Sequence, residues 1–158
     1  MTVKLDSRFN VVPSIENAGG TQTSQAGAAT STVTGSSVNV PNKPESGLTY
    51  RIKVAGTKTG TNAAMKVHVK LGASQVLSLT APGNTAVDWV AEATIRFETY
   101  NVQKVAGYLL SNAAAVVADY AAAAVDCSAG AELLAQIQSQ HASDTVTAEI
   151  VSIESWVD

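Results

Sequence analysis

The sequence predicts an all-β protein, an antiparallel β-sandwich or jelly roll with an extended amino-terminal arm. From Leu48 onward, apolar and polar residues alternate with a period of two, which is typical of strands with one face in water. The motifs KTGTN, LGAS, APGN and CSAG, rich in turn-forming residues, separate the alternating runs. Strand patterns do not alternate with helix patterns, so a parallel sheet is not expected.

The clearest alternation lies in residues 50–54, 65–71 and 89–98. In residues 65–71, MKVHVKL, every second side chain is apolar and the three between them are basic or histidine. One face of each run is therefore expected to point into the sandwich. The residues predicted to form the core are Val67, Val69, Trp89, Ile95 and Phe97.

Residues 113–124 are unusually rich in alanine, which is the strongest helix former and is depleted in strands. A helix would also need a sustained apolar stripe, and the apolar residues here do not form one at helical spacing. The β alternative requires small side chains where two sheets approach closely, with two strands in residues 108–126 and another in residues 132–140. On local signals the two alternatives are even.

Residues 1–44 are predicted to be an extended, flexible arm, and residues 45–158 the β-sandwich domain. Residues 16–37 are mostly Gly, Ala, Ser, Thr and Gln, with too few large apolar side chains to offset the entropy of ordering them. An apolar patch before them either packs on its own domain or adds to a neighbouring subunit or host surface as a strand. The candidate capsid or neighbour anchors are Val3, Leu5, Phe9, Val11, Val12 and Ile15.

The composition excludes several classes of partner. The 158 residues fit one domain and carry a net charge of -3, with 15% charged residues. Without a cluster of Lys or Arg, nucleic acid is not an expected partner. The first ten residues lack the apolar core of a signal peptide. The sequence contains no run of 18 apolar residues, so a membrane span is not expected. We expect a protein made in the cytoplasm that binds neither nucleic acid nor membrane.

No catalytic, metal or cofactor site is predicted. Cys127 is the single cysteine, which excludes an internal disulfide and predicts a small buried or half-buried thiol. His68 is interpreted as a solvated side chain on the polar face of its strand, and His141 lies in an expected turn. Glu92 and Glu98 face outward on one strand about 20 Å apart, beyond the roughly 5–9.5 Å of a glycosidase pair. The chain is therefore not expected to be an enzyme.

The order of four segments carries a resemblance to a known family. GLTYRIKVAGTKTG is followed by MKVHVKL, then DWVAEATIRFET, then AVDCSAGAELLAQIQSQHASDTVTAEIVSIE. This order resembles the β-sandwich structural proteins of tailed bacteriophages, and in particular their capsid decoration, or cement, proteins. The resemblance covers residues 36–154. It implies that the alanine-rich stretch lines strands, and it contains no catalytic motif.

The resemblance implies a virion component on the capsid surface, where it would bind the major capsid protein and stabilise subunit joints. Homotrimers are common among such proteins, so a homotrimer is expected, and Trp156 is assigned to the core or to a subunit contact. The alternative is a jelly-roll module of a tail fibre or head spike that binds a host receptor or glycan. Its aromatic platforms would be Tyr100, Tyr108, Tyr120 and Trp156.

Overall fold

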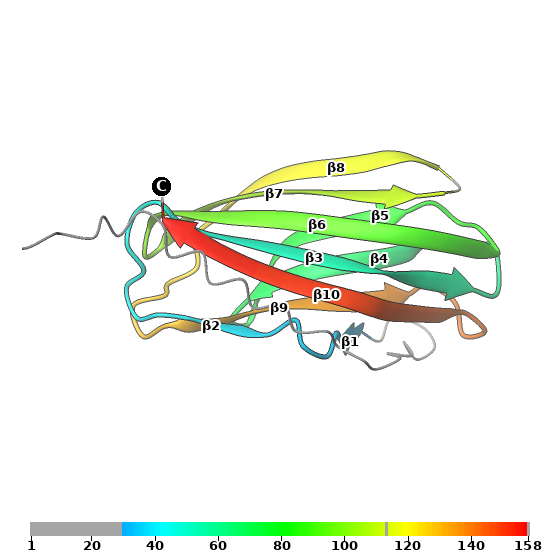
Figure 1. Ribbon diagram of the computed structural model, residues 1–158, viewed down its shortest axis with the longest axis horizontal. Helices are drawn as coiled ribbons and strands as arrows, with labels where there is room; N and C mark the ends of the chain where they lie inside the picture. Colours follow the sequence, from blue (N-terminus) through cyan, green and yellow to red (C-terminus); the bar gives the residue numbers. More distant parts are fainter. Residues whose placement is uncertain (1–29, 113, 158) are drawn as a thin grey trace, which may run out of the picture.

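A sandwich of two antiparallel sheets is formed by residues 30–112 and 114–157, the part of the chain that the computed structural model describes (Figure 1). Alternating side chains and glycine-containing turns set most of the strand bounds. The strands are β1 (Thr30–Thr32), β2 (Val38–Val40), β3 (Leu48–Thr59), β4 (Met65–Leu71), β5 (Ser74–Ala81), β6 (Ala86–Thr99), β7 (Val102–Ser111), β8 (Ala114–Ala123), β9 (Ala131–Ser139) and β10 (Thr145–Val157).

The first sheet, called sheet A, has the strand order β10-β3-β6-β7-β8. In the second, sheet B, the order is β9-β4-β5, and both β1 and β2 pair with the other side of β9. The chain crosses between the sheets after β2, β3, β5, β8 and β9. The edge strands β5 and β8 pack together on one side of the sandwich, and β9 lies near β10 on the other. The predicted antiparallel β-sandwich is confirmed.

The core lies between the sheets and consists of the side chains that alternation turns inward. The five residues predicted for it are all buried, which confirms the inward faces of β4 and β6. Phe97 meets Tyr50 of the neighbouring strand edge to face, with ring centroids 6.4 Å apart. Full burial of a large apolar side chain contributes about 1.5–3 kcal/mol, so this alternation is the main source of stability.

The alanine-rich stretch is a strand. β8 pairs with β7 from Ala114 opposite Ser111 to Ala123 opposite Gln103, which confirms the β interpretation. β8 pairs along its length with β7 and packs against β5 of sheet B. The sheets also approach closely at Gly107 of β7, where an added Cβ would lie 2.5 Å from Leu77 Cδ2 in sheet B. Tertiary packing therefore overrides the helix propensity of alanine.

Part of the predicted arm contributes to sheet B. Residues 30–44 hold β1 and β2, which pair with β9. Ser36 joins them to β9, because its Oγ donates to Val33 O at 2.7 Å and accepts the Ala135 N–H at 3.0 Å. Strand pairing in the described chain therefore begins at Thr30.

His68 is buried, so its interpretation as a solvated side chain is wrong. It lies on the outer face of sheet B, as alternation predicts, but only 5% of it is exposed. β4 is an inner strand, and Nε2 of His68 is 3.1 Å from Oε1 of Gln138 on β9. Burial lowers the pKa of His68, the Gln138 contact opposes this, and the charge of Lys66 lowers the pKa further.

Candidate functional site

The structure gives no position for most of the predicted site residues. All six candidate anchors, between Val3 and Ile15, lie outside the described residues. Trp156 does not belong to the core, because it lies partly exposed on the outer face of sheet A. The guanidinium carbon of Arg51 is 5.8 Å from the centroid of the Trp156 ring, and Arg51 also forms an ion pair with Glu154. A subunit contact at Trp156 stays a prediction.

The residues considered for chemistry do not come together. Cys127 is fully buried, as predicted, and burial raises the pKa of its thiol, with a smaller contribution from the charge of Asp126. His141 is exposed in the turn before β10, where its Nδ1 accepts the Ser143 N–H at 3.1 Å. Among the described residues, no group of three or more His, Cys, Asp or Glu side chains could hold a metal ion.

The two glutamates considered as a glycosidase pair have other contacts. Oε2 of Glu92 accepts a hydrogen bond from the Tyr108 hydroxyl at 3.2 Å. The partial burial of Tyr108 raises the pKa of its hydroxyl, and the charge of Glu92 raises it further. Oε1 of Glu98 is 2.8 Å from an Arg96 nitrogen and 3.9 Å from the Lys104 ammonium. Both glutamates lie on the outer face of sheet A, where they bind cations or hydroxyls of that face.

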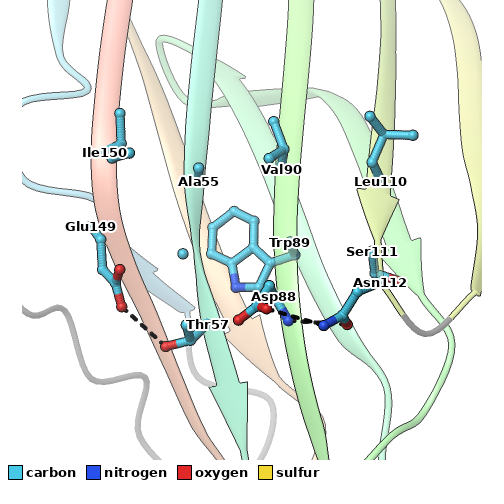
Figure 2. Close-up of a pocket in the computed structure, with 11 residues that line it drawn as sticks. Ala55, Thr57, Asp88, Trp89, Val90, Leu110, Ser111, Asn112, Glu149 and Ile150 are labelled. Carbon is cyan, nitrogen blue, oxygen red and sulfur yellow. Dashed lines mark hydrogen bonds between the residues drawn. The ribbon is translucent and has the colours of Figure 1, made fainter.

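A row of four apolar side chains crosses the outer face of sheet A. Ile150 of β10 pairs with Ala55 of β3, Ala55 with Val90 of β6, and Val90 with Leu110 of β7. Figure 2 shows the four side chains side by side across these strands. Ile150 is 56% exposed and Leu110 is 40% exposed. We call these four residues the apolar row.

The apolar row forms one wall of a shallow hollow of about 420 Å³. Gly56, which has no side chain, and the backbone of Trp89 lie at its floor, because the Trp89 side chain turns toward the core. The opposite wall is polar and is held by paired side chains (Figure 2). The polar contacts are Thr57 Oγ1 to Glu149 Oε1 at 3.2 Å and Asn112 Nδ2 to Asp88 Oδ2 at 3.1 Å.

A second hollow of about 260 Å³ lies on the same face, nearer to β8. Tyr108 and Glu92 line it from β7 and β6, and Ala118 and Asp119 line it from β8. Tyr120, 64% exposed, is on the same face of the sheet as Tyr108. The structure therefore places two of the predicted aromatic platforms on the same face of the neighbouring strands β7 and β8. Tyr100 lies instead in the turn between β6 and β7.

Sequence reasoning missed the apolar row because a β-bulge creates it. Ala148 pairs with Gly56 and Ile150 pairs with Ala55, so Glu149 is an extra residue in β10. Without it, strict alternation from Ala148 would turn Ile150 inward. The bulge turns Ile150 outward and Val151 inward. The adjacent apolar residues Ile150 and Val151 were the signal, because they interrupt the two-residue period.

Comparisons with known proteins show no family. No protein-family model matches the chain, and no curated protein matches it. A legume lectin-like domain from Entamoeba histolytica is similar over 87% of this chain and 83% of its own, with 8% identity and a TM-score of 0.43. Peanut lectin with a 9mer peptide is similar over 94% and 99% of the two chains, with 7% identity and a TM-score of 0.36.

A third solved structure, the alginate lyase from Klebsiella pneumoniae, is similar over 69% of this chain and 56% of its own, with 9% identity and a TM-score of 0.24. All three TM-scores are below 0.5, so these likenesses carry no argument about function. None of the three is described as a bacteriophage protein, and the resemblance stated above stays a prediction. In residues 30–112 and 114–157 there is no helix long and apolar enough to cross a membrane.

Proposed function

We propose that this protein is a structural component of a tailed bacteriophage, which binds the outer surface of the capsid and cements the joints between capsid subunits. The single observation that supports the proposal most directly is the apolar row on the water-facing side of sheet A. Exposed apolar patches with polar rims are typical of surfaces that bind other proteins. Its partner would be the major capsid protein, and its location the virion surface.

The physical argument is one of contact area. A capsid joint offers a broad, fixed surface, and adhesion to it depends on the apolar area covered and on good packing. The hollow beside the apolar row would receive a projecting side chain, and the polar wall of Thr57 and Asp88 would supply hydrogen bonds at the rim. Many copies on one shell, held as homotrimers, would add their modest affinities through a high effective concentration.

Capsids assembled without this protein, mixed with purified variants, test the proposal. We expect Leu110→Glu and Ile150→Glu each to weaken capsid binding at least about tenfold, because a charge would be buried against the shell. Val102→Glu is the matched control, since Val102 is 42% exposed but lies outside the apolar row. Row variants that decorate capsids as well as the unmodified protein does, with normal unfolding temperatures, would contradict the proposal.

The predicted arm has its own test. A chain without residues 1–20 should keep the circular dichroism of a β-sandwich and attach to capsids more weakly. Normal decoration by the truncated protein would remove the arm from the proposed capsid contact.

The second candidate is a glycan- or receptor-binding module of a tail fibre or head spike. It is favoured by the second hollow, which Tyr108 and the Glu92 carboxylate line, and by the exposed Tyr120 on the same face of β8. In such a site the aromatic faces stack on sugar rings, and the carboxylate accepts hydrogen bonds from sugar hydroxyls. A glycan array would distinguish the candidates: binding lost in Tyr120→Ala but kept in Leu110→Glu would support the glycan module over capsid docking.

A further inference from the structure

β8 is a strand edge with little protection against pairing. Of the strands that the structure describes, only β7 pairs with β8, so the backbone groups on the other side of β8 have no partner strand in either sheet, although β5 packs nearby. The ten residues of β8 contain no proline and no lysine, and Asp119 is their single charge. Long edges without such features are templates for another strand. The opposite edge, β10, is different, because a bulge and two glutamates interrupt it.

The hydrogen-bond pattern identifies which groups face outward. Asn112 donates its backbone N–H to Asp88 on β6, so alternate residues of β7, such as Gly107, turn toward β8. Gly107 pairs with Asp119, and the N–H of the next residue, Tyr120, therefore faces away from the sheet. That N–H donates to Oδ1 of Asp119 at 2.8 Å. The Asp119 carboxylate thus occupies a donor that an incoming strand would use.

The amino-terminal sequence has the pattern and the length of a strand that would fit this edge. In residues 3–12, VKLDSRFNVV, Val3, Leu5, Phe9 and Val11 fall on alternate positions with Ser7, and charged or amide residues fill the positions between them through Asn10. A period of two is what strand addition needs, since backbone hydrogen bonds give affinity and alternate side chains give specificity. Ten residues match the length of β8.

We propose that residues 3–12 of one copy of this chain add as a strand to the free edge of β8 in the next copy. A backbone carbonyl of the incoming strand takes the Tyr120 N–H, and the released Asp119 carboxylate pairs with a cation of that strand. Residues 3–12 carry two cations, Lys4 and Arg8, and one anion, Asp6. Charge complementarity therefore favours this occupant over a second β8, because pairing two β8 edges across a twofold axis brings two Asp119 carboxylates together.

The position of β1 favours pairing between copies over pairing within one. β1, where the described chain begins, lies at the edge of sheet B opposite β5, and β5 packs against β8 (Figure 1). An arm that leaves from β1 would have to wrap around its own sandwich to reach its own β8. The arm would instead reach the β8 edge of an adjacent copy in a head-to-tail contact. Such a contact gives a closed ring, such as a trimer, when the rotation from one copy to the next closes. The inference rests on the proposed homotrimer and not on capsid binding.

Charge exchange in the full-length protein tests the contact. In sedimentation equilibrium, Asp119→Lys and the double variant Lys4→Glu with Arg8→Glu should each weaken trimer formation about tenfold per interface, the effect of turning attraction into repulsion at one cross-strand pair. The combined triple variant should recover to within about threefold of the unmodified protein. Glu45→Lys, the same charge change in an exposed loop, is the matched control. Unchanged assembly in the first two variants, or no recovery in the third, would overturn the proposal.

Cross-linking decides which chains are joined. Ser7→Cys and Ala118→Cys are introduced together in a Cys127→Ala background, because both positions lie on the face opposite Asp119 and its paired cation. Isotopically heavy and light chains are refolded together before a short bis-maleimide is added. We expect links between positions 7 and 118 that join heavy and light chains. Links within single chains only, or links between two positions 118, would overturn the proposal. Trimers that cross-link as expected but fail to bind capsids would contradict the proposed function and leave this inference standing.

Discussion

The Lys58 ammonium lies 3.0 Å from Oδ2 of Asp144, and both side chains are fully buried. Lys58 also donates to the carbonyls of Thr61 at 2.8 Å and Asn84 at 2.7 Å, and Oδ1 of Asp144 accepts the Thr61 N–H. These partners come from β3 and from the turns before β4, β6 and β10. One ion pair therefore joins three turns at the same end of the sandwich. Alternation along β3 places Lys58 on the inward side, after Val54 and Gly56.

Removing the ammonium should destabilise the protein strongly. We expect Lys58→Met to lower the free energy of unfolding by about 3–5 kcal/mol, because the Asp144 carboxylate and two carbonyls stay buried without their donor. Urea unfolding followed by tryptophan fluorescence measures the change. Arg51→Met, which removes an exposed ion pair with Glu154, is the matched control and should cost less than about 1 kcal/mol. An equal loss in both variants would contradict the special role of the buried pair.

The same ion pair should make the protein sensitive to acid. Burial by itself raises the pKa of Asp144, but the hydrogen bonds from Thr61 and the Lys58 ammonium outweigh it and hold that pKa below its ordinary value of 3.8. A carboxyl with a lowered folded pKa stabilises the fold above its unfolded pKa and loses that contribution as pH falls through the folded value. Unfolding free energy should therefore drop steeply below about pH 4. Asp144→Asn should flatten this part of the profile.

His68 should give a second pH dependence in a different range. Its pKa is lowered from the ordinary 6.5, chiefly by burial. The unfolded chain therefore binds a proton at a higher pH than the folded chain, and stability falls as pH decreases from about 6.5 to the lowered folded pKa. His68→Gln should remove this decline. His141→Gln, which changes the exposed histidine, should retain it. Thermal unfolding temperatures measured between pH 5 and 8 test this. The same pH dependence in both variants would contradict the assignment to His68.

Gly56 should not tolerate even a methyl group. A Cβ added there would lie 1.8 Å from the Thr147 carbonyl oxygen on β10, next to the bulge at Glu149. We expect Gly56→Ala to lower the unfolding free energy by about 3 kcal/mol or more, because a backbone atom must move. Gly72→Ala is the comparison, since its Cβ meets no atom closer than 4.0 Å and its φ of +58° costs only about 1–2 kcal/mol. Calorimetry that finds the two variants equally stable would contradict this difference.

Local patterns predicted the strands well where one face alternates cleanly. The inward faces of β4 and β6 followed from single residues such as Val67 and Phe97, because the direction of a side chain in a strand repeats every two residues. β8 was different, because alanine gave no alternation to read. Its conformation depends on pairing with β7 and on packing against β5 of the other sheet.

The candidate site could not be predicted in the same way. The apolar row needs Ile150 to face outward beside Ala55, and Val90 to align with Leu110, so it depends on a bulge and on the order of strands in sheet A. A shift of one residue in any of these pairings would break the row. The predicted anchors, by contrast, were chosen from the amino-terminal segment outside the described residues, where they remain a prediction.

The sequence by itself determined that this protein is an antiparallel β-sandwich, which side chains of β4 and β6 enter its core and where its glycine turns fall. Only the tertiary structure decided that Lys58 meets Asp144, that His68 is buried and that Ile150 and Leu110 share one apolar row. The physical reason is range. A two-residue period is a property of each strand alone, whereas burial and register between distant strands depend on sheet order and on bulges.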